Sequence, residues 1–203
     1  MCEPASMVVT KKQVFWSKTS DSHEEIIEEF GLKERDTRGD YTFVRVEITP
    51  PDRDFSAPLR KWQYKLDETD TSYLPKWYEE KGVEKKVRIA LKDWRKQKII
   101  MPNQAVNELK NDDYILVCYG SVENVRDSAT IKNVYGSATI EYVCDSATIK
   151  NVYGSATIKS AKGHSTVTVY IKVDRGFLQS AHAVLIDRSS NKPKCYVRKG
   201  RRE

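Results

Sequence analysis

The sequence contains no apolar run that approaches the roughly 20 residues needed for a membrane-spanning helix. The N-terminus also lacks the basic stretch followed by an apolar stretch that is typical of a secretory signal peptide. Cysteine is scarce, since the 203 residues include four, without metal-binding or redox spacing (Cys2, Cys118, Cys144 and Cys195). These absences predict free thiols and a cytoplasmic location, in a reducing cytosol.

The sequence also lacks the motifs that carry common enzymatic chemistry. It has no glycine-rich phosphate loop, no nucleophile elbow and no closely spaced pair of histidines or cysteines. The three histidines, His23, His164 and His182, are far apart. Acids beside His23 are explained without a metal, because acids in the first turn of a helix complement its dipole. We therefore expect no catalytic residues, no metal site, no cofactor and no enzymatic activity.

Positive charge is concentrated at the C-terminal end of the chain. The formal net charge is +6, and Arg188–Glu203 alone contains seven basic residues and one acidic residue. The rest of the chain is therefore neutral. A terminal block of like charge often serves as an interaction arm, so Lys199, Arg201 and Arg202 are candidate nucleic-acid-binding residues.

The sequence does contain a tandem repeat. Four nine-residue units follow one another over Ser128–Gly163, and they read SATIKNVYG, SATIEYVCD, SATIKNVYG and SATIKSAKG. A longer period is superimposed, because Ser128–Ile140 and Ser146–Ile158 are identical and lie eighteen residues apart. Self-similarity of this kind indicates a fold built by stacking one unit on the next.

The apolar positions of each unit predict how the repeat folds. Ala129 and Ile131 fit one face of a short strand, where side chains alternate. Val134 can point inward with them only if the chain turns near Lys132–Asn133. A turn in every unit predicts a β-solenoid with about eighteen residues per rung and identical side chains about 4.8 Å apart. The alternative, an antiparallel meander, would leave half of the apolar residues in water.

The solenoid makes a specific prediction about burial and about a surface. Apolar side chains should be buried (Ala129, Ile131, Val134, Ala138, Ile140 and Val143), whereas Thr130, Lys132 and Tyr135 should be exposed. Stacked identical side chains form a flat, rigid recognition surface. Its candidate residues are Thr130, Thr139, Thr148, Thr157, Tyr135 and Tyr153.

The sequence divides into three segments. Residues 1–102 predict a small α+β domain, residues 103–173 the solenoid, and residues 174–203 a C-terminal β-hairpin cap with a basic tail. Ala181–Ile186 and Cys195–Val197 are the expected arms of the hairpin. Asn103–Asp113 is polar and is interpreted as a bridge into the solenoid.

The first segment predicts the order β-α-β-β-α. The expected elements are a loose start at Met1–Val8, a strand at Val9–Ser17, a helix that begins at Thr19–Glu25 and ends at Gly31, strands at Tyr41–Thr49 and Lys61–Leu66, a helix at Val83–Lys96 and a returning strand at Lys98–Met101. The aromatic side chains Trp62, Tyr64, Trp77, Tyr78 and Trp94 are interpreted as core, with stacking on nucleic-acid bases as the alternative.

One face of the second predicted helix is basic. Lys85, Arg88, Lys92 and Arg95 are spaced so that they share it, away from Trp94. Such a stripe can neutralise phosphates, and it is the second candidate nucleic-acid contact. An ordinary solvated face, with Glu84 and Asp93 nearby, explains the same pattern.

Several short segments of the sequence resemble a known group of proteins. VRVEITP (Val44–Pro50), LPKWY (Leu74–Tyr78) and VRIALKDW (Val87–Trp94), followed by tandem nine-residue repeats, resemble bacteriophage and prophage proteins with a small N-terminal α+β domain and β-solenoid repeats. Asp67–Tyr73 departs from the pattern. The resemblance implies a phage setting and the cytosol of a host cell. It supplies no established activity and no catalytic residues.

The sequence favours a non-enzymatic binding protein whose repeat surface meets a host or phage protein, with counter-defence as one setting. A nucleic-acid-binding protein that uses the basic tail and the helix stripe is the second hypothesis. A structural or assembly spacer is the third. We also expect a homo-oligomer, with a two-fold dimer as the first choice.

Overall fold

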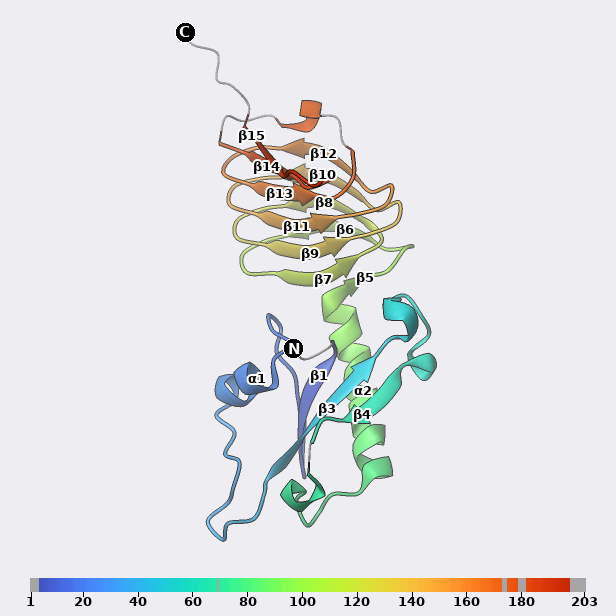
Figure 1. The fold of residues 1–203 in the computed structure, drawn as a ribbon, viewed down its shortest axis with the longest axis vertical. Coiled ribbons are helices and arrows are strands. Elements are labelled where there is room, and N and C mark those ends of the chain that lie inside the picture. Colours follow the sequence, from blue (N-terminus) through green and yellow to red (C-terminus); the bar gives the residue numbers. More distant parts are fainter. Residues whose placement is uncertain (1–3, 69, 173–174, 179–181, 198–203) are drawn as a thin grey trace. The chain divides into compact units, whose positions relative to one another are not determined.

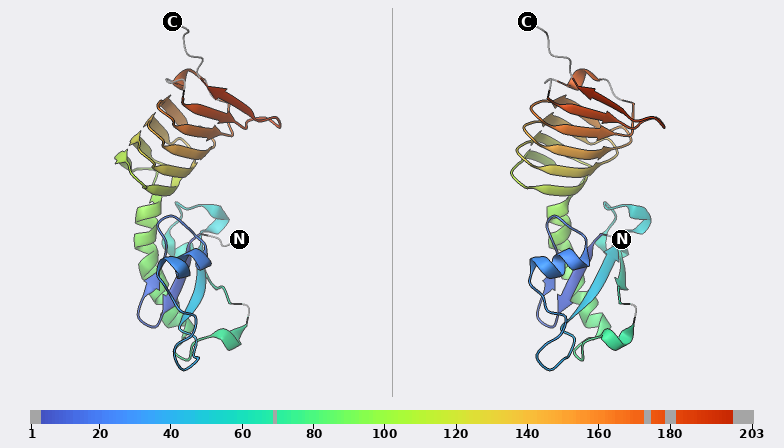
Figure 2. Two further views of the ribbon diagram at one scale, coloured as in Figure 1. Left: turned by 90° about the vertical axis from the view of Figure 1, so that its left-hand side faces the viewer. Right: turned by 60° about the vertical axis from the view of Figure 1, so that its left-hand side comes forward.

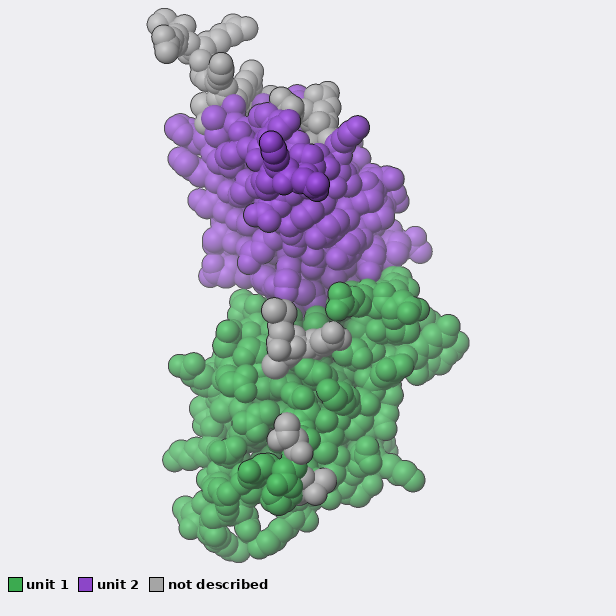
Figure 3. Space-filling view, viewed as in Figure 1, with its two compact units in different colours: residues 1–97 green, residues 98–203 purple. Residues whose placement is uncertain are grey.

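The computed structural model describes residues 4–68, 70–172, 175–178 and 182–197 (Figure 1). The chain divides into two compact units, residues 1–97 and residues 98–203 (Figure 3). The first unit contains a small antiparallel sheet and helices, and the second is a β-solenoid.

The sheet of the first unit has four strands in the order β2-β1-β3-β4. The strands are β1 (Ser6–Thr10), β2 (Val14–Phe15), β3 (Phe43–Thr49) and β4 (Gln63–Leu66). The strand predicted at Val9–Ser17 is two short strands, because the chain turns at Thr10–Gln13, where the Thr10 hydroxyl donates to the Gln13 carbonyl. The prediction of a loose start at Met1–Val8 is wrong for Ser6–Val8, which are buried in β1.

Two α-helices accompany this sheet, α1 (His23–Glu29) and α2 (Glu80–Lys98). Helix α1 begins as predicted, since the hydroxyl of Ser22 accepts a hydrogen bond from the Glu25 backbone N–H at 3.4 Å. It ends before Gly31, whose φ of +59° is accessible to glycine at low cost. Short 3-10 turns are η1 (Pro51–Arg53), η2 (Leu59–Lys61), η3 (Thr71–Tyr73) and η4 (Arg175–Phe177).

Helix α2 contributes the apolar stripe that its periodicity predicts. Its stripe residues are at most 2% exposed (Val83, Val87, Leu91 and Trp94). The rings of Trp62 and Trp94 meet edge to face with centroids 6.0 Å apart. These two tryptophans are therefore core residues, as interpreted from the sequence, and do not offer a ring face to a nucleic-acid base.

The second unit consists of two sheets, parallel except for the last strand of the larger one, that form opposite walls of a solenoid (Figure 2). One wall contains β6 (Ala105–Leu109), β8 (Ser121–Val125), β10 (Thr139–Val143) and β12 (Thr157–Ala161). The other contains β5 (Ile99–Ile100), β7 (Tyr114–Cys118), β9 (Thr130–Val134), β11 (Thr148–Val152), β13 (Thr166–Val169), β14 (Val184–Asp187) and β15 (Lys194–Val197). We call them the four-strand wall and the seven-strand wall.

The register of the strands confirms the predicted rung. Thr148 pairs with Thr130 and with Thr166, so the chain returns to the same place after eighteen residues. Ile131 and Val134 are both fully buried, and β9 pairs in parallel with β11. The antiparallel meander is thereby excluded. All six residues predicted to be buried in the repeat are at most 1% exposed.

The residues predicted to be exposed are only half-exposed. Thr130, Lys132 and Tyr135 are of intermediate burial. The physical reason is the stacking itself, because each side chain is covered on two sides by its counterparts in neighbouring rungs.

The solenoid begins earlier than predicted. Ile99–Ile100 was expected to return into the first domain, and it instead pairs with Val117–Cys118 as the first strand of the seven-strand wall. The polar segment interpreted as a bridge contains β6, which pairs with β8. At the first corner, a Cβ on Gly120 would lie 2.3 Å from the Gln104 carbonyl oxygen, so the tight return requires glycine there.

The chain ends its described part in a hairpin. β14 adds to the seven-strand wall in parallel with β13, and β15 then pairs antiparallel with β14. The two segments predicted as hairpin arms do pair with each other. The turn between them projects from the stack of rungs (Figure 2).

Candidate binding surface of the solenoid

The surface begins at the corner where each rung turns after the seven-strand wall. The backbone ladder continues one residue past each strand, since the Tyr135 N–H donates to the Cys118 carbonyl and the Tyr153 N–H to the Val134 carbonyl. The next residues, Gly136 and Gly154, have φ of +65° and +68°. Glycine adopts this conformation without strain, so the same turn recurs and brings each tyrosine into register.

Four tyrosines form a continuous stack at this corner, which we call the tyrosine column. Its members are Tyr119, Tyr135, Tyr153 and Tyr170. Successive ring centroids are 5.9, 5.1 and 4.9 Å apart, with interplanar angles of 30°, 13° and 20°. The sequence predicted the pair Tyr135 and Tyr153. Tyr119 and Tyr170 extend it, although they lie 16 and 17 residues from their neighbours in the column and so do not keep the eighteen-residue period of the repeat.

The faces of the two central rings, Tyr135 and Tyr153, are covered by neighbouring rings on both sides. Tyr119, Tyr135 and Tyr153 are half-buried, and Tyr170 is 37% exposed. Burial, together with the neighbouring hydroxyls of Tyr135 and Tyr170, raises the pKa of Tyr153. The column is therefore a row of partly exposed aromatic rings, ordered by their stacking.

The threonines predicted as one surface lie on two. Thr130 and Thr148 pair on the seven-strand wall, whereas Thr139 and Thr157 pair on the four-strand wall. The nine-residue period explains the split, since consecutive units alternate between the walls. Thr166 extends the first pair, so a row of three threonines runs along the outer face of the seven-strand wall.

Asparagines fix the bend in the strands of the seven-strand wall. The side-chain amide of Asn151 donates to the Lys132 carbonyl at 3.0 Å and to Oδ1 of Asn133 at 3.1 Å. Asn133 in turn donates to the Leu116 carbonyl at 3.1 Å. A stack of asparagines satisfies amide groups that the turn would otherwise leave unpaired, so the wall is a rigid base for the column.

The opposite corner carries acidic and histidine residues. Asp127 and Asp145 have φ of +56° and +54°, and Oδ2 of Asp145 accepts the Asp127 N–H at 3.3 Å. His164 and His182 stack with ring centroids 4.8 Å apart. The sequence placed these histidines far apart, although their eighteen-residue separation equals one rung and would have predicted the contact.

Two of the four basic residues in the helix stripe predicted to bind phosphate, Arg88 and Arg95, make contacts within the first unit. Arg88 pairs with Glu84 at 2.7 Å and donates to the carbonyls of Leu59 and Trp62. Arg95 donates to the Ala57 carbonyl at 3.2 Å. Lys85 and Lys92 are exposed. The arginines therefore hold the loop before β4, and only the lysines offer solvent-facing charge.

The other predicted nucleic-acid contacts, Lys199, Arg201 and Arg202, lie outside the described residues.

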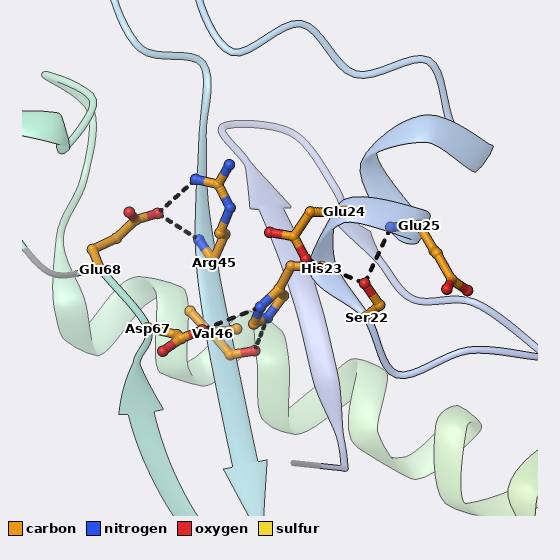
Figure 4. Close-up of polar contacts among 8 residues, drawn as sticks. All are labelled: Ser22, His23, Glu24, Glu25, Arg45, Val46, Asp67 and Glu68. Carbon is orange, nitrogen blue, oxygen red and sulfur yellow. Dashed lines mark hydrogen bonds and ion pairs between the residues drawn. The ribbon is translucent and has the colours of Figure 1, made fainter. Parts of the chain in front are cut away.

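The first unit contains a polar cluster that sequence reasoning missed (Figure 4). His23 is 1% exposed, and its Nε2 lies 3.0 Å from the Val46 carbonyl oxygen while Nδ1 lies 3.2 Å from Oδ2 of Asp67. Both ring nitrogens thus have partners inside the protein. A general base needs a nitrogen within reach of a substrate, and this arrangement offers none.

Arg45 lies next to this pair on β3 (Figure 4). Glu68 accepts the Arg45 backbone N–H at 3.0 Å and lies 3.5 Å from its guanidinium, so the carboxylate replaces a main-chain acceptor where β4 ends. The adjoining pocket of about 210 Å³ is lined by Glu34, Tyr41, Phe43, Arg45, Glu68 and Tyr73. Arg45 also lies 3.7 Å from Glu34, so one guanidinium faces two carboxylates and the charged side chains that line the pocket have a net charge of −1.

Within the described part of the chain, no group of three or more histidine, cysteine, aspartate or glutamate side chains is arranged to hold a metal ion. No described helix is long and apolar enough to cross a bilayer.

No protein-family model, no curated protein and no solved structure matches the chain.

Proposed function

We propose that this protein is a non-enzymatic binding protein of phage type, whose solenoid presents a rigid surface to a host protein. The observation that carries the proposal is the tyrosine column, which follows the C-terminal ends of the same strands that begin with the threonine row. Tyrosine is enriched among the residues that dominate binding energy at protein interfaces, because it combines large contact area with a polar hydroxyl.

The stacking of the column supports this use. A side chain that is already ordered loses little further entropy when a partner binds, and ordering costs about 0.5–1.5 kcal/mol for each mobile side chain. Tyr135 and Tyr153 are held by their neighbours on both sides. Their edges and hydroxyls suit contacts to a protein surface, whereas bases require open ring faces.

The proposal is tested by recovering partners from host cells with the wild-type chain and two variants. Tyr135→Ser with Tyr153→Ser removes the central rings, and Tyr135→Phe with Tyr153→Phe keeps the stack as the matched control. We expect one protein partner that binds wild type and the phenylalanine variant more tightly than the serine variant. Equal recovery by all three would contradict the proposal.

Nucleic acid is the competing outcome of the same experiment. Its retention would fall steeply as salt rises and would disappear on nuclease treatment. It would also depend on Lys85, Lys92 and the basic tail rather than on the column.

A further inference from the structure

The outer face of the seven-strand wall becomes more apolar at its last two strands, β14 and β15. In the register of the sheet, Val184 follows the threonine row as the partner of Thr166, and Ile186 follows Thr168. Leu185 is fully buried in the core, so Val184 and Ile186 on either side of it lie on the outer face of the wall. Both of these outer side chains are half-buried.

β15 continues this apolar face. Val197 lies opposite Val184, and Cys195 lies opposite Ile186, in the antiparallel pairing of the two strands. Cys195 is exposed, and Val197 is 53% exposed. The four side chains form one cluster, which we call the hairpin face (Val184, Ile186, Cys195 and Val197). Exposed clusters of this kind on soluble proteins commonly mark interaction sites.

Among the described strands, the second strand of the hairpin, β15, lies at the edge of the sheet. β15 is the last strand of the wall, and among the described residues its only strand neighbour is β14. An edge strand presents a row of backbone N–H and C=O groups that pair with an added strand. An extended peptide that joins β15 would also place every second side chain beside Cys195 and Val197.

The charges around this edge select the chemistry of the added strand. Arg188, Lys192 and Lys194 are exposed on or beside the hairpin. The segment from Arg188 to the end of the sequence carries seven basic residues and one acidic residue. A second copy of this chain would bring two such positive ends together, and like charges at a contact cost several kcal/mol. An acidic strand would instead be attracted.

We propose that the edge of β15 binds an extended, acidic segment of a protein partner, which adds to the wall as a further strand and covers the hairpin face. This inference deepens the proposed function and rests on it, since it names the part of the partner that the solenoid engages. Basic residues at the edge then have two effects, because they repel a second copy and attract the partner. A nucleic acid would meet the charges but would gain nothing from an aliphatic face.

The experiment uses the full-length protein and a synthetic peptide in which glutamate alternates with valine or isoleucine. We expect the peptide to shift the NMR signals of β15 and to slow amide hydrogen exchange at Lys194–Val197. Val197→Glu should weaken binding about tenfold or more, because it places a like charge beside the acidic strand. Lys150→Glu is the matched control. It also makes the protein more negative, at a position on the same wall but away from the hairpin, and it should weaken binding much less.

Two altered peptides make the test decisive. A peptide with alternate backbone amides methylated cannot pair with a strand edge, and a peptide with lysine in place of glutamate reverses the charge. Equal binding of the methylated peptide would overturn strand addition, and equal binding of the lysine peptide would overturn the preference for acid. Absence of binding by the glutamate peptide would overturn the inference as a whole.

Two further outcomes would also overturn it. Exchange protection of β15 that rises with protein concentration, without peptide, would identify a second copy as the occupant. Displacement of the peptide by a single-stranded oligonucleotide with the same shifts at Val197 would identify nucleic acid. Failure here is distinguishable from failure of the proposed function, because the partner recovery depends on Tyr135 and Tyr153, which the peptide experiment leaves intact.

Discussion

Tyr135 and Tyr153 are eighteen residues apart in the sequence, and their ring centroids lie 5.1 Å apart at an angle of 13°. This contact shows that residues separated by one rung, or eighteen positions in the sequence, become neighbours in the solenoid. Each rung repeats the turn of the last, so any property of one unit becomes a column along the molecule. The following predictions use such columns, and the contacts that support the first unit, as their starting points.

Ile149→Asp should unfold the solenoid. Ile149 is fully buried between Ile131 and Val167 in the neighbouring strands. An unpaired charge in an apolar core costs several kcal/mol, which is comparable to the whole stability of many domains. Circular dichroism during thermal unfolding measures the loss. Lys150→Asp is the control, since the Lys150 side chain is exposed. A folded Ile149→Asp protein with the stability of the control would refute the packing described.

Tyr153 should titrate later than an ordinary tyrosine. Burial and the hydroxyls of Tyr135 and Tyr170 raise its pKa in the folded protein. The stability that Tyr153 contributes through this shift is therefore fully present below its unfolded pKa, near 10, and is lost as pH rises through the folded value. The difference in tyrosinate absorbance between wild type and Tyr153→Phe isolates this group. Titration of Tyr153 at or below the pKa of an ordinary tyrosine would contradict the described environment.

Arg88→Ala should destabilise the first unit by about 1–3 kcal/mol, because the carbonyls of Leu59 and Trp62 lose their donor. Lys85→Ala should change stability by no more than about 0.5 kcal/mol, since Lys85 is exposed. Denaturant unfolding of both variants measures the difference. Equal effects would mean that the arginine is an ordinary surface charge and would restore the whole stripe as a candidate phosphate contact.

His23→Leu should destabilise the first unit by about 1–3 kcal/mol. The substitution removes the partner of the Val46 carbonyl and leaves Asp67 without its imidazole. Glu25→Gln is a suitable control, because the Glu25 side chain is exposed and its backbone N–H, which binds Ser22, is unchanged. Unchanged stability in His23→Leu would show that the cluster is not structural and would reopen a chemical role for it.

Neutralising the basic tail decides the nucleic-acid hypothesis. Full-length protein with Lys192, Lys194, Lys199, Arg201 and Arg202 all replaced by glutamine should show no change in fold. If wild type is retained on nucleic acid at low salt and the variant is not, the tail is the contact. Unchanged retention would end this hypothesis for the tail.

The sequence predicts the solenoid well because its signal is repeated. Ile131, Ile140, Ile149 and Val134 recur at fixed intervals, and a parallel wall is the arrangement that buries all of them. The rung length follows from the identical eighteen-residue stretches for the same reason.

The solenoid's first rungs and the polar cluster of the first unit are harder to predict. β6 lies in a mostly polar segment, Asn103–Asp113, and is a strand because it pairs in parallel with β8. Likewise, His23 and Asp67 are 44 positions apart, and nothing in either local sequence indicates that the sheet brings them together. Tertiary pairing, which leaves no periodic trace in the sequence, decides both cases.

Consecutive nine-residue units alternate between the two walls, so whether the number of units is odd or even decides which wall carries the next strand. Removing two units would move the hairpin along the solenoid by one rung, about 4.8 Å, and would leave it on the same wall. Removing a single unit would transfer the hairpin to the opposite wall, away from the tyrosine column. Repeats can therefore be duplicated or lost in pairs without changing which wall carries the hairpin. Gain or loss of an odd number of units would change the wall.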